Sequence, residues 1–146
     1  MRSFIFFTFL FLSVASVAGE PIKDKDALEN ELINCLKGKP KEAKCITNVL
    51  GKNLLPRRKS AITVAAEMDE VIAKWLGKES VYSVHFIKSI KAGDITERRD
   101  YVIEDSAGNF MLMNVVTINH LGNIYIYKFH VSSLDEDLEE ALNPKN

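Results

Sequence analysis

The 146-residue sequence lacks the patterns that usually mark a metal, nucleotide or nucleophile site. It contains no His-x-His or His-Glu-x-x-His pair, no glycine-rich phosphate loop and no Gly-x-Ser-x-Gly element. It also lacks an excess of basic charge, since 19 basic and 20 acidic residues give a formal charge of −1, whereas nucleic-acid binders need cations to neutralise phosphates. We therefore expect no cofactor, no metal and no nucleic-acid partner.

Only one long apolar run is present, and it stands at the N-terminus. Met1-Arg2-Ser3 gives one positive charge, residues 4–14 are nearly all apolar, and Ser16-Val17-Ala18 places small residues where a signal peptidase cleaves. Residues 4–18 are fewer than the roughly 20 that a bilayer-spanning helix needs, which disfavours the alternative of an uncleaved anchor. The sequence therefore predicts a signal peptide over residues 1–18, cleavage near Ala18, a secreted or periplasmic protein, and no stable membrane insertion afterwards.

The mature chain is predicted to be one domain with one disulfide. Cleavage leaves 128 of the 146 residues, enough for one hydrophobic core but too few for two ordinary domains. Cys35 and Cys45 are the only cysteines, and export would place them in an oxidising compartment where such a pair is usually bridged. Their spacing is not Cys-x-x-Cys, so a structural disulfide is favoured over a redox site.

The part of the chain from about residue 26 to residue 76 has helical periodicity. A capping box predicts that a first helix begins at Asp26 and ends near Gly38. A second helix is expected over about 41–51, so that the predicted disulfide staples a helical hairpin. A third helix is expected over 61–76 because its apolar residues recur on one face.

From about residue 80 to residue 131 the apolar period changes from 3.6 to 2, which indicates strands rich in Val, Ile, Tyr and Phe. The turns between the strands are short and contain glycine, so neighbouring strands must be antiparallel. We therefore predict an α+β fold in which N-terminal helices precede a four-stranded meander wrapped on a helix. The predicted strands are 81–90, 98–104, 110–118 and 123–131. A second capping box, at Ser133, predicts a short C-terminal helix whose apolar positions would dock on the domain: Leu134, Leu138 and Leu142.

The third and fourth predicted strands are apolar on both faces, unlike a sheet with one wet face. On the third strand one face carries Phe110, Leu112, Val116 and Ile118, and the other carries Met111, Met113 and Val115. On the fourth strand the pattern sets Ile124 and Ile126 opposite Tyr125, Tyr127, Phe129 and Val131. Both faces therefore need cover, which internal helices, a homodimer through the sheet, or a ligand would supply.

Two basic clusters have alternative interpretations. Arg57-Arg58-Lys59 is either a solvated loop before the third helix or a processing site in a secreted precursor. The pair Arg98-Arg99 is interpreted as charge on an edge strand, where it would oppose aggregation, in preference to an anion site.

The segment from Tyr101 to Val131, YVIEDSAGNFMLMNVVTINHLGNIYIYKFHV, resembles the C-terminal hairpins of the cystatin-like superfamily, especially its nuclear transport factor 2-like branch. The resemblance lies in an apolar strand, a glycine-containing turn and a closing strand that ends in Phe129-His130-Val131. It implies a curved antiparallel sheet around a helix, sometimes with a pocket and often dimeric. The early β-hairpin of the family is absent, as are the Gln-x-Val-x-Gly loop and Pro-Trp hairpin of cysteine-protease inhibitors.

Four side chains are candidates for acid/base chemistry of the kind used by isomerases and dehydratases: His85, His130, Asp100 and Tyr101. They would form a site only if they shared one sheet face, and the alternative is that each histidine is a hydrogen-bonded packing residue. We therefore expect an exported, non-catalytic binding module for a protein or a small apolar ligand. A small acid/base enzyme and an accessory envelope protein are the alternatives.

Overall fold

The computed structural model describes residues 19–56 and 60–133. The predicted signal peptide, the basic run at 57–59 and the predicted C-terminal helix after Ser133 lie outside the described residues. Within them, no helix is both long enough and apolar enough to cross a bilayer.

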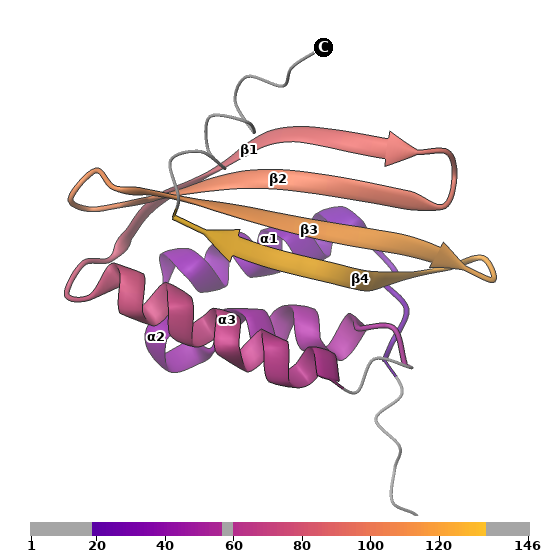
Figure 1. Ribbon diagram of the computed structural model, residues 1–146, viewed down its shortest axis with the longest axis horizontal. Coiled ribbons are helices and arrows are strands. Elements are labelled where there is room, and N and C mark those ends of the chain that lie inside the picture. The colour runs from indigo at the N-terminus through magenta and orange to yellow at the C-terminus, as the bar shows by residue number, and fades with distance from the viewer. Residues whose placement is uncertain (1–18, 57–59, 134–146) are drawn as a thin grey trace, which may run out of the picture.

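The described chain folds into two layers, with the helices on one face of a single sheet (Figure 1). The helices come first in the sequence and the strands follow, so the predicted α+β class is confirmed. The helical elements are α1 (Lys25–Lys37), α2 (Pro40–Ala43), the π-helical turn η1 (Ile46–Leu50), the 3-10 turn η2 (Gly51–Asn53) and α3 (Ser60–Leu76).

The sheet is the predicted antiparallel meander, with strand order β1-β2-β3-β4. Tight turns join the strands, and each contains a glycine with positive φ, a conformation that side chains with a Cβ rarely adopt. Because β2 lies between β1 and β3, the interpretation of Arg98-Arg99 as edge-strand charge is wrong. The strands are β1 (Val81–Ala92), β2 (Thr96–Asp105), β3 (Phe110–His120) and β4 (Asn123–Ser132).

The helix boundaries differ locally from those expected. The side chain of Asp24 caps α1 by accepting hydrogen bonds from the backbone N–H groups of Asp26 and Ala27, so the helix begins earlier than the predicted capping box. The second predicted helix is interrupted because Lys44 adopts a left-handed conformation with φ of 46°. One continuous helix over 41–51 was therefore wrong.

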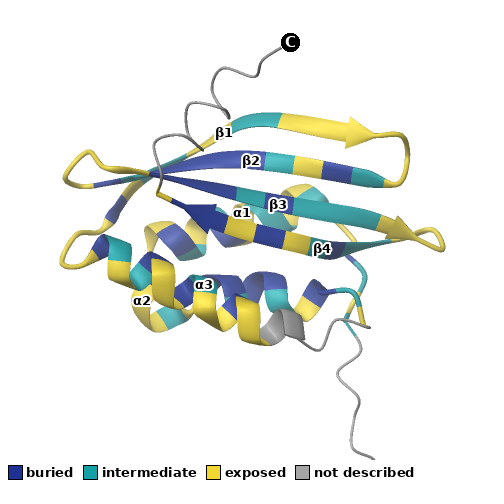
Figure 2. Ribbon diagram, in the orientation of Figure 1, coloured by how far each residue is buried: buried dark blue, intermediate teal, exposed yellow. Residues whose placement is uncertain are grey.

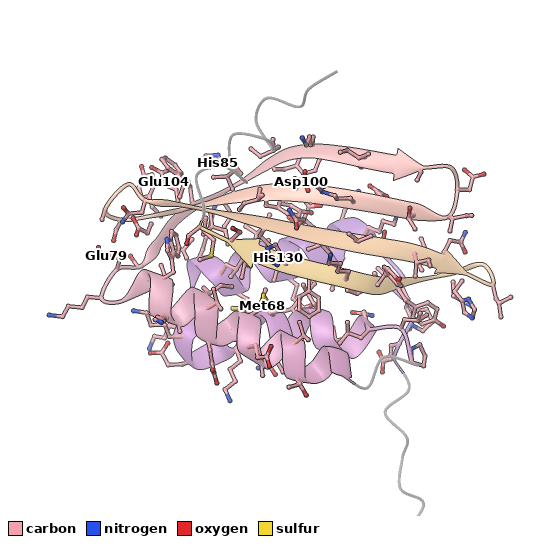
Figure 3. All side chains as sticks on the ribbon, viewed as in Figure 1. Met68, Glu79, His85, Asp100, Glu104 and His130 are labelled. Atoms are coloured by element: carbon pink, nitrogen blue, oxygen red, sulfur yellow. A yellow bond between two sulfur atoms is a disulfide. The ribbon has the colours of Figure 1, made fainter. Side chains whose placement is uncertain are left out.

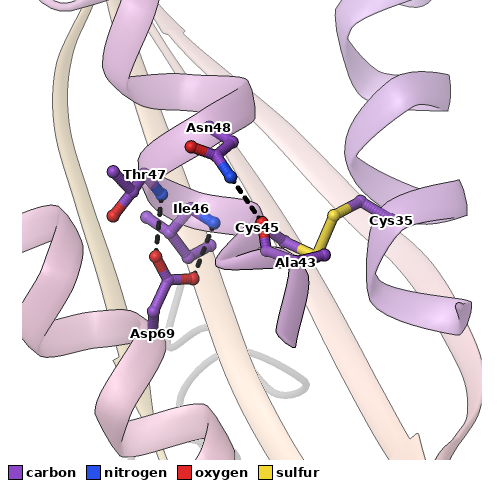
Figure 4. The surroundings of a disulfide bond; sticks show 7 residues. All are labelled: Cys35, Ala43, Cys45, Ile46, Thr47, Asn48 and Asp69. Carbon is purple, nitrogen blue, oxygen red and sulfur yellow. Dashed lines mark hydrogen bonds between the residues drawn. A yellow bond between two sulfur atoms is a disulfide. The ribbon is translucent and has the colours of Figure 1, made fainter. Parts of the chain in front are cut away.

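The disulfide joins α1 to the start of η1 (Figure 4). Cys35 and Cys45 are bonded with an S–S distance of 2.09 Å, and Cys45 is fully buried. Next to it, the buried carboxylate of Asp69 on α3 accepts hydrogen bonds from the backbone N–H groups of Ile46 (2.8 Å) and Thr47 (2.9 Å). These bonds satisfy donors at the start of η1 that have no partner within the helix, so α3 fixes η1 from the other side.

The core lies between the helices and the inner face of the sheet, the face that the helices cover (Figure 2). On β4 the alternation changes at an irregularity in the pairing with β3, where Val116 opposes Lys128 but Thr117 opposes Ile126. The extra residue, Tyr127, lets Ile126 and Phe129 both reach the core. The expectation that these two side chains point to opposite faces was therefore wrong.

Candidate functional site

The four predicted acid/base residues lie on both faces of the sheet. Tyr101 faces the helices and belongs to the core, whereas Asp100, next to it on β2, points to the outer face, the face opposite the helices. Asp100 opposes Asn114, which in turn opposes His130, so two strand spacings, about 10 Å, separate Asp100 from His130. His85 lies on β1, on the far side of β2 from His130 (Figure 3). The fold does not bring the four together.

Asp100 is held in an ion pair on the outer face. Its side chain is fully buried, and Arg98 donates to both of its oxygens, from Nε at 2.7 Å and from Nη2 at 2.9 Å. Lys88 Nζ lies 4.0 Å from the same carboxylate. Two-point pairing with a guanidinium is among the strongest charge-assisted contacts, so this carboxylate is suited to holding cations in place.

His85 forms a polar cluster with Ser83 and Glu104 near one end of the sheet (Figure 3). Ser83 Oγ lies 2.6 Å from His85 Nε2 and donates to Glu104 Oε2 at 2.8 Å, while the same Nε2 lies 3.5 Å from that oxygen. In a nucleophilic triad the histidine uses one ring nitrogen for the serine and the other for the acid. Here one nitrogen faces both groups, so the cluster does not have the geometry that activates a serine.

A different charged cluster lies beneath the sheet, where α1 meets β2. Lys25 Nζ donates to Glu97 Oε2 at 2.5 Å, and Arg99 donates from Nε to Glu97 Oε1 at 2.9 Å. The Arg99 guanidinium also pairs with Glu29 one turn further along α1. Ser89 Oγ on β1 donates to Glu97 Oε1 at 2.8 Å. Glu97 is therefore a buried carboxylate with three side-chain donors, and it joins α1, β1 and β2.

The pKa values in this cluster follow from its pairing. Burial acts to raise the pKa of Glu97, but the hydrogen bonds from Lys25, Arg99 and Ser89 outweigh it and lower the pKa from 4.5 to about 2. Burial acts to lower the pKa of Arg99, but Glu97 and Glu29 reverse this and raise it. Burial, followed by the charge of Glu29, raises the pKa of Tyr101. At neutral pH Glu97 is therefore ionised, Arg99 is charged and Tyr101 is protonated, so the pairing of Glu97 with Arg99 is maintained.

We expect acid to destabilise the protein through Glu97. Its pKa is about 2 when folded and near 4.5 when unfolded, so between these values the unfolded chain binds more protons. The stabilisation is complete above about pH 4.5 and is lost as the pH falls through about 2. Urea unfolding measured across this window should show that the free energy of unfolding declines as the pH falls. Glu97→Gln should make this decline with pH less steep.

Glu97→Gln should keep part of the pH dependence of the free energy of unfolding. Hydrogen bonds from Asn109 and nearby backbone N–H groups outweigh burial and also lower the pKa of Asp105. Glu31→Gln is the control, because the ion pair between Glu31 and Lys52 is exposed and should contribute little to the free energy of unfolding. An unchanged slope in Glu97→Gln would contradict the assignment.

Two hollows flank the Lys25–Glu97 pair. The first is a cavity of about 30 Å³ beneath the sheet, lined mainly by core side chains with Lys25, Glu29 and Arg99 at its edge. The second, which we name the hairpin hollow, has a volume of about 270 Å³ and lies at the turn between β1 and β2. Lys25 and Thr117 line both. The other residues of the hairpin hollow are Lys91, Gly93, Asp94, Ile95, Thr96, Glu97, Asn119 and Ile124.

The hairpin hollow has a polar lining with balanced charge. Its cations are Lys25 and Lys91 and its anions are Asp94 and Glu97. Threonine hydroxyls and the amide of Asn119 supply neutral donors and acceptors. Over the described ranges, no group of three or more His, Cys, Asp or Glu side chains is arranged to hold a metal. The lining is suited to hydrogen bonding with a ligand that carries no large net charge.

Sequence reasoning missed this cluster. Glu97, Arg99 and Tyr101 alternate along β2 and therefore share one face, which was a usable signal. Their partners on α1 lie about 70 positions away, with sequence separations of 72 for Lys25 to Glu97 and 70 for Glu29 to Arg99. Such pairs depend on how α1 packs against the sheet, and no local pattern reports that.

Neither a family model nor a curated protein matches this sequence. Among solved structures, the chain is similar to a protein of the DUF4783 family from Bacteroides ovatus, with 8% identity, a TM-score of 0.43, and coverage of 71% of this chain and 93% of that chain. A DUF4783 family protein from Bacteroides uniformis is similar with 12% identity, the same TM-score of 0.43, and coverage of 73% and 96%. Likenesses at these TM-scores carry no argument about function.

Proposed function

We propose that the chain is an exported, non-catalytic binding module that recognises an exposed polypeptide segment of another protein in the hairpin hollow. The observation that carries the proposal is the preformed, charge-balanced polar lining of that hollow, which the ion pair between half-buried Lys25 and buried Glu97 fixes in place. A ligand that enters a site of this kind loses little free energy to reorganisation of the protein.

The volumes of the two hollows favour a polypeptide segment as the ligand over a small apolar molecule enclosed by the protein. The cavity beneath the sheet, at about 30 Å³, is far smaller than the roughly 300 to 1,000 Å³ of small-molecule pockets. The hairpin hollow, at about 270 Å³, approaches that range but opens at the molecular surface. An open hollow of this size fits one or two side chains of a partner together with their backbone.

Charge and exposed apolar surface point to the same class of ligand. Two cations and two anions cancel in the hairpin hollow, so it does not select for a strongly charged ligand. The hydrogen-bonding groups match peptide N–H and C=O groups, and Ile95, which is 64% exposed, offers an apolar contact at the rim. An apolar anchor surrounded by polar groups is the usual anatomy of a protein-binding surface.

A photo-crosslinking amino acid at Ile95 tests the proposal. In the exported protein we expect a discrete adduct with one partner protein, and mass spectrometry should locate the partner peptide. Phe110 is the control position, because it is 47% exposed but lies at the opposite end of the sheet. Equal labelling at both positions, or none at Ile95, would refute binding through the hairpin hollow.

The relation to the nuclear transport factor 2-like branch stays a proposal, supported by a meander sheet with helices on one face. Acid/base catalysis by His85, His130, Asp100 and Tyr101 stays a prediction from the sequence. No geometric observation favours it, because the four side chains do not converge.

A further inference from the structure

The outer face of the sheet carries an apolar patch that is more buried than the described elements explain. Val102 on β2 and Leu112 on β3 are only 7% and 4% exposed, and Ile87 on β1 packs against them. The described helices all lie on the inner face (Figures 1 and 2). Side chains on an open sheet face normally remain accessible to water, so this patch requires a cover in addition to Ile87.

The course of the chain brings its last residues to this patch. The final residue of β4, Ser132, lies directly opposite Leu112 in the strand register and is itself buried. Thirteen residues, 134–146, follow the described part of the chain. A helix of that length would measure about 20 Å, enough to cross the roughly 15 Å from β4 to β1. The C-terminal segment can therefore reach every strand of the outer face.

The chemistry of the segment complements that of the face. Leu134, Leu138 and Leu142 recur every four residues, which would align them in one stripe of a helix. Five acidic residues lie between and beside them: Asp135, Glu136, Asp137, Glu139 and Glu140. The outer face carries three cations, Lys88, Arg98 and Lys128, against two carboxylates, Asp100 and Glu104. Its net charge is positive, so it attracts the acidic segment.

We propose that residues 134–142 cover the outer face of their own chain as an amphipathic helix. The leucines pack on Val102, Leu112 and Ile87, and the acidic residues lie near Lys88 and Lys128. This arrangement supplies the cover that the two-sided apolar strands require. It also closes the outer face to a second copy of the chain, so a homodimer through this face would first have to displace the segment.

Carbodiimide cross-linking of the full-length mature protein tests the proposal directly. The reagent joins carboxylates to amines in contact, so we expect cross-links from the acidic residues of 135–140 to Lys88 or Lys128. An equal mixture of isotope-labelled and unlabelled chains separates links within one chain from links between chains. Links within one chain support the proposal, whereas mixed-label links would show that a second copy occupies the face and would overturn it.

A matched pair of variants tests the role of the leucine stripe. Leu138→Ser should abolish the cross-links to Lys88 and Lys128 and shift the NMR methyl signals of Val102 and Leu112. Asn143→Ser changes the same segment outside the stripe and should leave both readouts as in the wild type. Cross-links mainly to Lys74 on the helix layer, or methyl signals unmoved by Leu138→Ser, would overturn the proposal.

Discussion

Replacing both cysteines, as Cys35→Ala with Cys45→Ala, is expected to lower the free energy of unfolding by about 3 kcal/mol. The cross-link closes a small loop over a sequence separation of 10, which restricts the unfolded chain. It also ties α1 to η1 at a position where Cys45 is fully buried. Urea unfolding followed by circular dichroism at neutral pH measures the change.

Reducing the wild-type protein should reproduce most of that loss, because reduction removes the cross-link but keeps the sulfur atoms in the core. Comparing the reduced wild type with the double variant therefore separates the effect of the covalent bond from the effect of packing. A double variant as stable as the oxidised wild type would show that Asp69 and the core contacts hold η1 in place without the bond.

The variant Arg99→Met is expected to lower the free energy of unfolding by a similar amount, about 3 kcal/mol. Methionine preserves much of the side-chain length but removes the charge shared by Glu97 and Glu29, whose side chains are only 8% and 20% exposed. Two poorly solvated carboxylates are then left with Lys25 as the remaining cation, and α1 loses one of its polar links to β2, the one between Glu29 and Arg99. Urea unfolding at neutral pH again gives the free energy.

Lys52→Met is the matched control, because Lys52 also pairs with a glutamate of α1, Glu31, but both side chains are about half exposed. An exposed pair of this kind contributes at most about 1 kcal/mol. If the Lys52 variant lost as much stability as the Arg99 variant, burial of the cluster would not be the cause. At low pH the stability lost in Arg99→Met should shrink, because protonation of Glu97 removes its repulsion with Glu29.

The strands could be predicted well because their signals are local. Alternating apolar residues and glycine-containing turns recur along the second half of the chain, and turns this short allow only antiparallel neighbours. The observed strands β1 to β4 extend the predicted ones by at most two residues at either end. The disulfide was also predictable, because only one pairing of two cysteines exists within a chain.

The helical half was harder to predict because small backbone events changed it. Lys44 adopts a left-handed conformation that ends α2, and the chain continues as a π-helical turn. Asp69, on a different helix, supplies the carboxylate that caps this turn. Neither event has a signature in the apolar period of residues 41–51.

By itself the sequence determined the order of helices and strands, the antiparallel pairing, the cysteine bond and the need to cover both sheet faces. Only the tertiary structure decided that Arg99 meets Glu97 and Glu29, that one strand separates Asp100 from His130, and that a hollow opens beside Lys25. The physical reason is that side-chain direction in a strand depends on register. One extra residue, such as Tyr127, reverses every direction that follows it, and partners about 70 positions apart meet only when the layers pack.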